Sequence, residues 1–372
     1  MIKVAVIHAH EGSVAWLRLL AKISSDGTIK FIKISSFDDN YYRSKKSLFF
    51  MLIFRIRTFI LFPISVIIKS IITKRYDKII VTSDPFYLPF IVVHCYRDSK
   101  IIVLEEDLYP EALTVKKIIK KNGFFYKVIE KININTLKKA DSVVFISKGH
   151  HDLYVKKYGF ISNFLIISTP SHLTNPPMPL FSNNYNIIKI LYSGTLGLMH
   201  DTSTFIKYLV NGNQFDGLNF IFRTSGAGKA LFENIIFQNH KALLTKGIIT
   251  LGDSLPVKEW ENLLKDSQVG IIFQSVGADQ VIFPSKVTSM LISGMAILLF
   301  AERKGSLASM IMDSDSGWVI PPNEIEILNE AILEIKNIDI LNRKRQNAYQ
   351  LGFSQFSISE ISEKWKNLII RG

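Results

Sequence analysis

The sequence predicts an α/β protein made of two doubly wound domains, each a parallel sheet covered by helices. Its 372 residues suit two domains at roughly 100–200 residues per domain. Short, continuous apolar runs alternate with longer amphipathic segments, which is typical of buried parallel strands joined by helices. A proline-rich segment with no charged residue, TPSHLTNPPMPLFSNNYN (169–186), interrupts this alternation once. We therefore expect domains at 1–170 and 187–352, a linker at 171–186, and a closing helical segment at 353–372 that can return to the first domain.

The first half of the chain contains six strand candidates with helical patterns between them. The strands are expected at 2–8, 29–34, 78–82, 100–104, 142–146 and 164–167. The helices are expected at 13–24, 47–73, 86–96, 122–139 and 148–157. The first run is a buried strand, because it is too short for the core of a signal peptide and has no small-residue cleavage site.

The second half repeats the pattern. Strands are expected at 187–194, 218–224, 247–251, 269–273, 296–300 and 317–320. Helices are expected at 201–211, 227–239, 256–265, 284–293, 306–311, 324–336, 338–351 and 356–370. A ligand is expected where the carboxyl ends of the strands in the two domains face each other.

The charge and cysteine content limit the partners and the compartment. A net charge of +13 points to an anionic partner, which can be a nucleic acid, a membrane surface or a phosphorylated substrate. The single cysteine, Cys95, excludes an internal disulfide and fits a reducing compartment. We expect it to be an inert core thiol. The most apolar stretch, 48–72, is interrupted by Pro63 and three cations, so we do not expect it to span a membrane.

Two glycine turns follow strands in positions suited to an anion. In the first domain, HAHEGS (8–13) places Gly12 before a helix, where backbone N–H groups are free. In the second domain, a strand runs into Gly194-Thr195-Leu196-Gly197 and then a helix with Asp201 as its N-cap. Each can also be an ordinary turn. Neither is GxGxxG, so a nicotinamide or flavin fingerprint is absent.

Two further features of the second domain point to the same chemistry. Gly226 and Gly228 form another glycine turn after the next strand, beside basic residues. Lys286, in FPSK (283–286), lies in the first turn of an expected helix, where a cation opposes the helix dipole unless an anion is bound. The alternatives are a tight turn and a lysine that reaches solvent.

Acidic residues cluster after an apolar strand of the first domain. EEDLYPE (105–111) brings four carboxylates together, and these can bind acceptor hydroxyls or act as a base. Helix capping around Pro110 is the alternative. The one Asp-x-Asp pair, Asp313 and Asp315, lies late in a turn, and no His/Cys cluster has zinc spacing. We therefore expect no metal and no cofactor.

Two segments are strongly basic. Residues 41–76 contain five phenylalanines and no acid, and their eight basic residues are Arg43, Lys45, Lys46, Arg55, Arg57, Lys69, Lys74 and Arg75. Residues 116–139 hold eight lysines and one acid, Glu130. Both can be helices that pack on the sheet with solvated lysines. However, cations mixed with apolar bulk suit an anionic bilayer, and no nucleic-acid-binding module accompanies them.

Six segments together resemble a known family. They are DLYPEA (107–112), ADSVVFISKG (140–149), LYSGTLGLMHD (191–201), SGAG (225–228), FPSKVTSMLISGMAI (283–297) and SGWVIPP (316–322). Their order and spacing, across nearly the whole chain, resemble the family-4 retaining glycosyltransferases of the GT-B fold. Within that family they are most similar to the branch that builds bacterial O-antigen, capsule and exopolysaccharide.

The resemblance implies a nucleotide-sugar donor, with a UDP-sugar as the first expectation, held mainly by the second domain. The residues that it implies around the donor are Gly194, Thr195 and Gly197 along the diphosphate, His200 nearby, Gly226 and Gly228 in the same cleft, Lys286 on a phosphate, Leu255 near the base and Gly12 near the reacting sugar. Asp107 or Glu111 would face the acceptor. The resemblance also implies that the leaving diphosphate helps to accept the proton and that transfer needs no metal.

The sequence departs from the family at several of these positions. Many relatives have two glutamates eight positions apart, the second of which binds the donor ribose, and these positions are Val281 and Ser289 here. Neither is acidic, and we expect Ser289 among the donor-binding residues. The phosphate-binding arginine and lysine of relatives fall near Thr195 and His200. Asp279 lies just upstream and can compensate.

We therefore expect a hexosyltransferase-type enzyme at the inner face of a bacterial cell membrane, cytoplasmic and peripheral. It would transfer a sugar, with retention, to a polyprenyl-diphosphate-linked glycan in surface polysaccharide synthesis. Its partners would be the donor, the lipid-linked acceptor and an anionic membrane surface, with no nucleic acid. A catalytically silent scaffold subunit of a polysaccharide assembly complex, or a nucleotide-sugar epimerase, remain alternatives.

Overall fold

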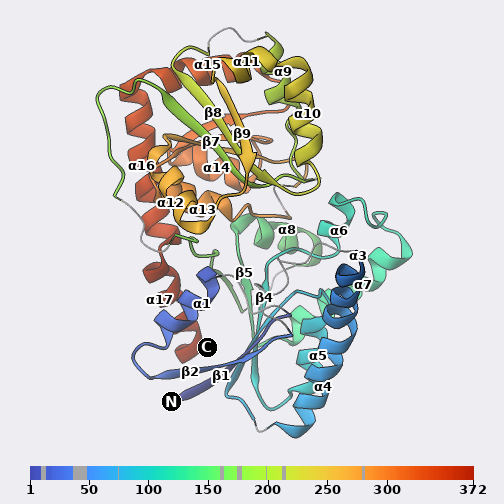
Figure 1. Ribbon diagram of the computed structural model, residues 1–372. Helices are drawn as coiled ribbons and strands as arrows, with labels where there is room; N and C mark the ends of the chain where they lie inside the picture. The colour runs from blue at the N-terminus through green and yellow to red at the C-terminus, as the bar shows by residue number, and fades with distance from the viewer. Residues whose placement is uncertain are drawn as a thin grey trace. The chain divides into compact units, whose positions relative to one another are not determined.

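The chain forms two compact α/β units in the computed structural model (Figure 1). Residues 1–9, 14–36, 48–73, 75–159, 163–173, 178–197, 199–211, 215–278 and 281–372 are described. The first unit consists of Met1–Pro170 and Ile358–Gly372, and the second of Ser171–Ser357. Each unit contains a six-stranded sheet whose described strand pairs are all parallel. The predicted fold class is therefore confirmed.

The sheet of the first unit has the order β2-β1-β3-β4-β5-β6. Its strands are β1 (Ile2–Ile7), β2 (Ile29–Ile34), β3 (Lys78–Thr82), β4 (Lys100–Glu105), β5 (Ser142–Phe145) and β6 (Phe164–Ile166). The helices are α1 (Val14–Ile23), α3 (Leu48–Ile56), η1 (Arg57–Leu61), α4 (Phe62–Ile72), α5 (Leu88–Cys95), α6 (Glu111–Val115), α7 (Phe124–Lys139), α8 (Lys148–Tyr158) and α17 (Ile358–Arg371).

Helices cover both faces of this sheet. On one face α5 packs against α4 and α7, and on the other α1 packs against α17 (Figure 1). Because both faces are covered, β3 and most of β4 are buried along their length, as the continuous apolar runs predicted. Cys95, which was expected in the core, is only half-buried at the end of α5.

One continuous helical segment, rather than a regular helix, occupies residues 48–72 of the predicted range 47–73. α3, η1 and α4 follow one another without a break, and η1 is a π-helical turn just before Pro63. In a regular helix the proline ring collides with the carbonyl one turn earlier, and a π turn widens the helix at that point. The side of the segment that faces the unit buries Thr58, Phe62, Pro63 and Val66.

The closing helix α17 belongs to the first unit. Trp365 packs edge-on against Trp16 of α1, with ring centroids 5.6 Å apart. Lys366 forms an ion pair with Asp26, and the Lys100 Nζ donates to the Gly372 carbonyl at 2.7 Å. The preceding helix runs to Phe356, and the turn between the two lies at Ser357.

The sheet of the second unit has the order β12-β11-β10-β7-β8-β9. Its strands are β7 (Ile188–Thr195), β8 (Leu218–Ser225), β9 (Ile249–Asp253), β10 (Val269–Phe273), β11 (Ala296–Phe300) and β12 (Gly317–Ile320). The helices are α9 (Ser203–Asn211), α10 (Lys229–Asn239), α11 (Lys241–Thr245), α12 (Val257–Asp266), α13 (Lys286–Ile292), α14 (Ser306–Asp313), α15 (Ile325–Lys336) and α16 (Ile338–Phe356). The sequence did not predict α11 or, in the first unit, α6.

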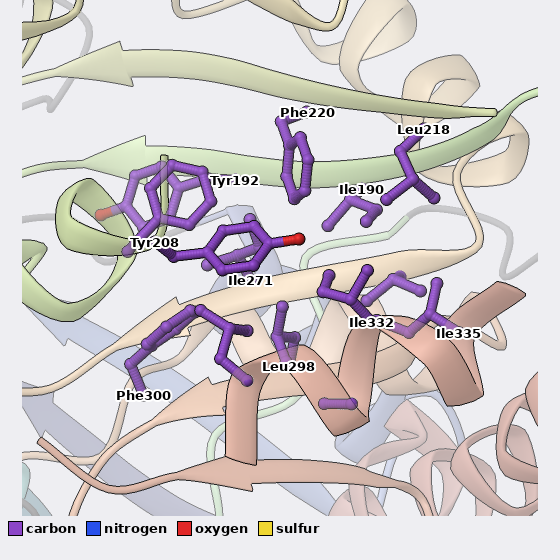
Figure 2. Packing of buried hydrophobic residues seen from close by; sticks show 14 of the residues in the cluster. Ile190, Tyr192, Tyr208, Leu218, Phe220, Ile271, Leu298, Phe300, Ile332 and Ile335 are labelled. Carbon is purple, nitrogen blue, oxygen red and sulfur yellow. The ribbon is translucent and has the colours of Figure 1, made fainter. Parts of the chain in front are cut away.

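An aromatic and aliphatic core supports the central strands of the second unit (Figure 2). Tyr192 of β7 is fully buried, and its ring lies 5.3 Å from that of Phe273 in β10. Phe205 of α9 lies 5.3 Å from Phe220 of β8. Such close packing fixes rotamers, so the end of β7 is a rigid platform.

The described part of the linker is fastened to the second unit. The Arg345 Nε donates to the Gly294 carbonyl at 2.9 Å, and its Nη1 donates to the Leu180 carbonyl at 3.1 Å. Gly294 has a φ of +69°, and a Cβ there would lie 2.5 Å from the Pro179 Cβ. Glycine is therefore required where the linker crosses the turn before β11.

Candidate active site

The second sheet has a topological switch point between β7 and β10. β8, the next strand along the chain, pairs with one edge of β7, while β10 pairs with the other. Ligands of open parallel sheets bind outside the carboxyl ends of the strands at such a point. The loops that follow β7 and β10 meet there, because the Ser275 N–H donates to the Met199 carbonyl at 3.0 Å.

Lys286 reaches this switch point from the start of α13. Its Nζ donates to the Tyr192 hydroxyl at 2.9 Å and lies 4.1 Å from the centre of that ring. A Cβ added to Gly194 would lie 3.3 Å from the same nitrogen, and Gly194 has a φ of +128°. The structure therefore brings together two predicted residues, Gly194 and Lys286, and adds Tyr192, which the sequence did not single out.

Within the part of the chain that the structure describes, the ammonium group of Lys286 forms no ion pair. Burial lowers the pKa of Lys286 to about 7. The Tyr192 hydroxyl donates to the Thr195 carbonyl at 2.8 Å, and burial raises its pKa, so it stays neutral. A partly buried cation beside a neutral hydroxyl is costly unless an anion pairs with it.

His200 lies beside this cation and is neutral. Burial and the charge of Lys286 lower the pKa of His200 to about 4. Its Nδ1 lies 3.1 Å from the Gly197 nitrogen and 3.3 Å from the Gly197 carbonyl oxygen. The neutral ring carries one N–H, on Nδ1 or Nε2 according to the tautomer. Thr195 is exposed next to them. The group thus offers a cation and neutral donors, which suits an anionic ligand.

The second glycine turn supports the first one. A Cβ on Gly226, where φ is +91°, would lie 2.6 Å from the Thr195 Cγ2 and 2.8 Å from the Leu196 carbonyl oxygen. The Leu196 N–H donates to the Ser225 carbonyl at 2.8 Å, and the Gly228 N–H to the Leu196 carbonyl at 2.9 Å. Close packing between the two turns accounts for both glycines, which the sequence had assigned to the ligand cleft.

The structure gives less support to the other positions that were expected around the donor. Ser289 is buried, and its hydroxyl accepts the His172 N–H at 3.1 Å and bonds with the Ser171 hydroxyl at 3.1 Å. It therefore anchors the start of the second unit. Leu255 is half-buried after the edge strand β9, and Val281 is buried. Gly12 and Asp279 lie outside the described residues.

In the first unit, the acidic cluster follows β4, and Glu105 is its most perturbed member. Its side chain is fully buried, and its Oε2 has no hydrogen-bond partner in the described chain. Burial, together with Asp107, Glu106 and Glu111, raises the pKa of Glu105 to about 8. Asp107 forms an ion pair of 3.1 Å with Lys116. The sequence placed Glu105 in the cluster but did not select it.

Glu111 belongs to a polar network on the helices. Its carboxylate accepts from the Tyr126 hydroxyl at 2.9 Å, from the Tyr158 hydroxyl at 3.3 Å and from Lys157. Lys157 also pairs with Glu130 at 3.1 Å. These bonds raise the pKa of Lys157 although burial opposes them. They tie α6, α7 and α8 together, so the contacts of Glu111 have a structural use.

Among the described residues, no group of three or more His, Cys, Asp or Glu side chains is placed to hold a metal ion. Asp315 instead pairs with Arg343 at 3.0 Å and with Lys344. These partners lower the pKa of Asp315, against the effect of burial.

The segment α3–η1–α4 turns a broad apolar face to solvent. Its exposed apolar side chains are Phe49, Leu52, Ile53, Ile56, Phe59, Ile60, Leu61, Ile64, Ile67, Ile68, Ile71 and Ile72. Arg55 and Arg57 are exposed among them, whereas Arg43, Lys45 and Lys46 lie outside the described residues. Within the described ranges, none of the helices has both the length and the apolar character needed to cross a membrane.

Solved structures share this architecture, although no family model and no curated protein sequence matches the chain. HepE of Anabaena, in complex with UDP, is 10% identical with a TM-score of 0.70, over 99% of both chains. Sucrose-phosphate synthase from Thermosynechococcus elongatus is 11% identical with a TM-score of 0.68, over 99% of this chain and 98% of that one.

A third structure is WaaG, a glycosyltransferase involved in lipopolysaccharide biosynthesis. It is 12% identical with a TM-score of 0.62, over 99% of this chain and 100% of that one. At these identities the likeness shows the fold. The chain therefore has the two-domain GT-B fold of glycosyltransferases.

Proposed function

We propose that this protein is a glycosyltransferase that takes a sugar from a UDP-sugar. The observation that carries the proposal is Lys286, a half-buried cation at the switch point of the second sheet. Within the described residues its Nζ donates to the Tyr192 hydroxyl and forms no ion pair. A nucleoside diphosphate supplies the missing negative charge. HepE has been solved with UDP and with UDP and glucose, and GtfA, 18% identical to this chain, with UDP and GlcNAc.

The proposed reaction forms a bond between an acceptor hydroxyl oxygen and the anomeric carbon of the sugar. The bond from that carbon to the diphosphate breaks on the same face, and its electron pair leaves with the diphosphate. The hydroxyl proton passes to a diphosphate oxygen. Lys286 stabilises the charge that develops on the leaving group, and neutral His200 can donate the N–H of its Nε2 tautomer. The sugar configuration is retained.

We infer a lipid-linked glycan acceptor at the inner face of a bacterial membrane, as in surface polysaccharide synthesis. The exposed apolar face of α3–η1–α4, with Arg55 and Arg57 among its side chains, supports contact with an anionic bilayer. A membrane-bound enzyme meets its lipid-linked acceptor in two dimensions. Asp107, at the strand ends of the first unit, is the carboxylate that we assign to the acceptor.

A transfer assay tests the proposed function. Purified protein is first screened by thermal shift with UDP-, GDP- and dTDP-sugars, since a ligand at about 100 times its Kd adds roughly 2.7 kcal/mol of stability. The stabilising donor is then incubated with bacterial lipid-linked acceptors. Release of UDP together with a glycosylated lipid supports the proposal. Binding without turnover would identify a silent scaffold, and interconversion of two nucleotide-sugars would identify an epimerase.

Activity is expected to be independent of divalent metal. The described residues contain no cluster that can hold such an ion, and Lys286 supplies a positive charge at the proposed diphosphate position. Turnover should therefore be the same in chelator as in Mg²⁺ or Mn²⁺. Loss of turnover in chelator, with recovery on adding either ion, would contradict this expectation and redirect attention to Asp313 and Asp315.

Affinity for UDP is expected to fall as the pH rises above 7. In the free protein Lys286 loses its proton near that value, whereas a bound diphosphate favours the charged form and raises its pKa. Binding then takes up a proton, and the affinity decreases by about tenfold per pH unit above pH 7. The neighbours Tyr192 and His200 stay neutral in this range. Calorimetry between pH 6 and 9 measures the slope.

The variant Lys286→Arg provides the control for this pH dependence, because arginine stays charged throughout the range. Its affinity for UDP should change little with pH. An equal slope in both proteins would show that another group takes up the proton.

A further inference from the structure

The first turns of α7 and the loop before it carry a second exposed apolar surface. Ile118, Phe124, Phe125 and Val128 are exposed to 65%, 76%, 68% and 40%. The rings of Phe124 and Phe125 lie edge to face, 5.6 Å apart. We call these four side chains the Phe124 surface. Exposure of two adjacent phenylalanines to water is unfavourable, and covering them with another apolar surface lowers the free energy.

The Phe124 surface is held in place from beneath. The loop is bonded to α6, since the Ile118 N–H donates to the Leu113 carbonyl at 2.9 Å, and to itself, since the Gly123 N–H donates to the Lys120 carbonyl at 3.1 Å. Tyr126 and Ile129, on the opposite side of α7, are buried. The Tyr126 hydroxyl donates to Glu111 at 2.9 Å. The phenylalanines therefore project from a fixed base.

Lysines surround these apolar side chains. Lys117, Lys120, Lys121, Lys127 and Lys131 are all exposed. The one acidic residue between 116 and 131 is Glu130, and its carboxylate is bonded to Lys157 at 3.1 Å and to the Tyr158 hydroxyl at 3.0 Å. Among the described residues no ion pair includes any of these five lysines, and the complement of their charge is an anionic surface.

We propose that the Phe124 surface docks on an anionic lipid bilayer, with its phenylalanines among the acyl chains and its lysines at the headgroups. This deepens the proposed function, on which it rests for the choice of a bilayer as the partner. Aromatic bulk inside a ring of lysines suits the interface between water and acyl chains. α5 contacts both α7 and α4, so the surface belongs to the same helical layer as the apolar α3–η1–α4 segment.

The two proposed membrane contacts, the α3–η1–α4 segment and the Phe124 surface, differ in chemistry. The α3–η1–α4 segment exposes mainly aliphatic side chains along its length, whereas the Phe124 surface is compact, aromatic and strongly basic. Each basic residue adds attraction to anionic lipid that falls with salt. A second contact on the same unit turns its attachment into a two-point one, which is stronger than either alone.

Vesicle binding by the full-length protein tests this proposal. The double variant Phe124→Ser/Phe125→Ser should bind vesicles of phosphatidylcholine and phosphatidylglycerol at least about tenfold more weakly than the wild type. The control is Phe237→Ser/Phe353→Ser, two exposed phenylalanines of the second unit, at 55% and 52%, and it should bind like the wild type. Melting temperatures of both variants should be unchanged, because all four side chains are exposed.

The variant Phe124→Trp measures how deeply the side chain at position 124 enters the bilayer. Brominated lipids should quench its additional fluorescence in anionic vesicles and leave it unquenched in Lys120→Gln/Lys121→Gln at moderate salt. Unchanged vesicle binding of the serine variant, or absence of quenching, would overturn the proposal and leave a protein partner as the occupant. UDP affinity should be the same in all variants, so failure of the transferase proposal would appear in UDP binding and failure of this one in vesicle binding.

Discussion

Replacing Lys286 with methionine is expected to weaken UDP binding by roughly tenfold to 150-fold, while the folded protein becomes no less stable. A charge-assisted hydrogen bond to a phosphate contributes roughly 1.5–3 kcal/mol, and each 1.4 kcal/mol is about tenfold in affinity. Methionine has a similar length and keeps the packing against Tyr192. This combination is specific, because few other substitutions are expected to weaken UDP binding without lowering the stability of the fold.

The stability part of this expectation follows from the pKa. Lys286 has a lowered pKa of about 7 in the folded protein and an ordinary one when unfolded. The unfolded chain therefore binds more protons between these two values, and the contribution of Lys286 to the free energy of unfolding rises with pH across that window. At or below pH 7 its buried charge is most destabilising. Lys286→Met removes this cost, so its melting temperature at pH 7 should equal or exceed that of the wild type.

Lys229→Met is the matched control. This lysine lies after the second glycine turn, but it is paired with Asp253 and, at 3.6 Å, with Glu233. Its replacement should leave UDP affinity nearly unchanged. Calorimetric titration with UDP and thermal melts of both variants provide the measurements. If Lys286→Met binds UDP as tightly as the wild type, the diphosphate does not lie at the end of β7, and the assignment of this site fails.

The sequence predicted the sheets well, because buried parallel strands require continuous apolar runs. Runs such as 296–300 are fully buried as β11, and the proline-rich stretch marks the start of the second unit. The short helices α6 and α11 were missed, since five residues carry too little periodicity to be recognised. The π turn at η1 was also missed, because it depends on how Pro63 is accommodated.

Residues of the candidate site could be predicted where the residue type is unusual for its position in the sequence. They could not be predicted where the role of the residue depends on its burial and contacts in the fold. Gly194 and Lys286 are distant in the sequence, but each was notable alone, and the sheet order brings them together. Tyr192 resembles any core aromatic until its hydroxyl is seen beside Lys286. Glu105 is distinguished from its acidic neighbours only by its burial. The use of Ser289 as an anchor depends on a contact with Ser171.

Charge reversal along the basic segment at 41–57 is expected to release the protein from anionic vesicles. The variant replaces five residues with glutamate: Arg43, Lys45, Lys46, Arg55 and Arg57. Each basic residue near an anionic surface contributes about 1 kcal/mol before screening, so reversal costs about 5 kcal/mol or more of attraction. Arg55 and Arg57 are exposed, and their replacement should not unfold the first unit.

The apolar face of α3–η1–α4 makes this segment the larger of the two membrane contacts. Twelve large apolar side chains are exposed along it, and each one that enters the interface adds roughly 1.5–3 kcal/mol. Apolar insertion requires electrostatic attraction to bring the helix to the bilayer, so wild-type binding should rise with the fraction of anionic lipid and fall with salt. Co-sedimentation with vesicles across a salt series measures both.

The control for this variant must carry the same change in net charge. Glutamate at five exposed lysines of the second unit, Lys241, Lys246, Lys258, Lys265 and Lys304, provides it, and this control should bind vesicles far more tightly than the variant at 41–57. If the two proteins bind equally, long-range net charge and not this segment governs attachment. If the 41–57 variant binds like the wild type while Phe124→Ser/Phe125→Ser does not, the bilayer contact rests on the Phe124 surface alone. In that case the exposed apolar side chains of α3–η1–α4 must be covered by another protein chain, since twelve such groups in water would otherwise promote aggregation.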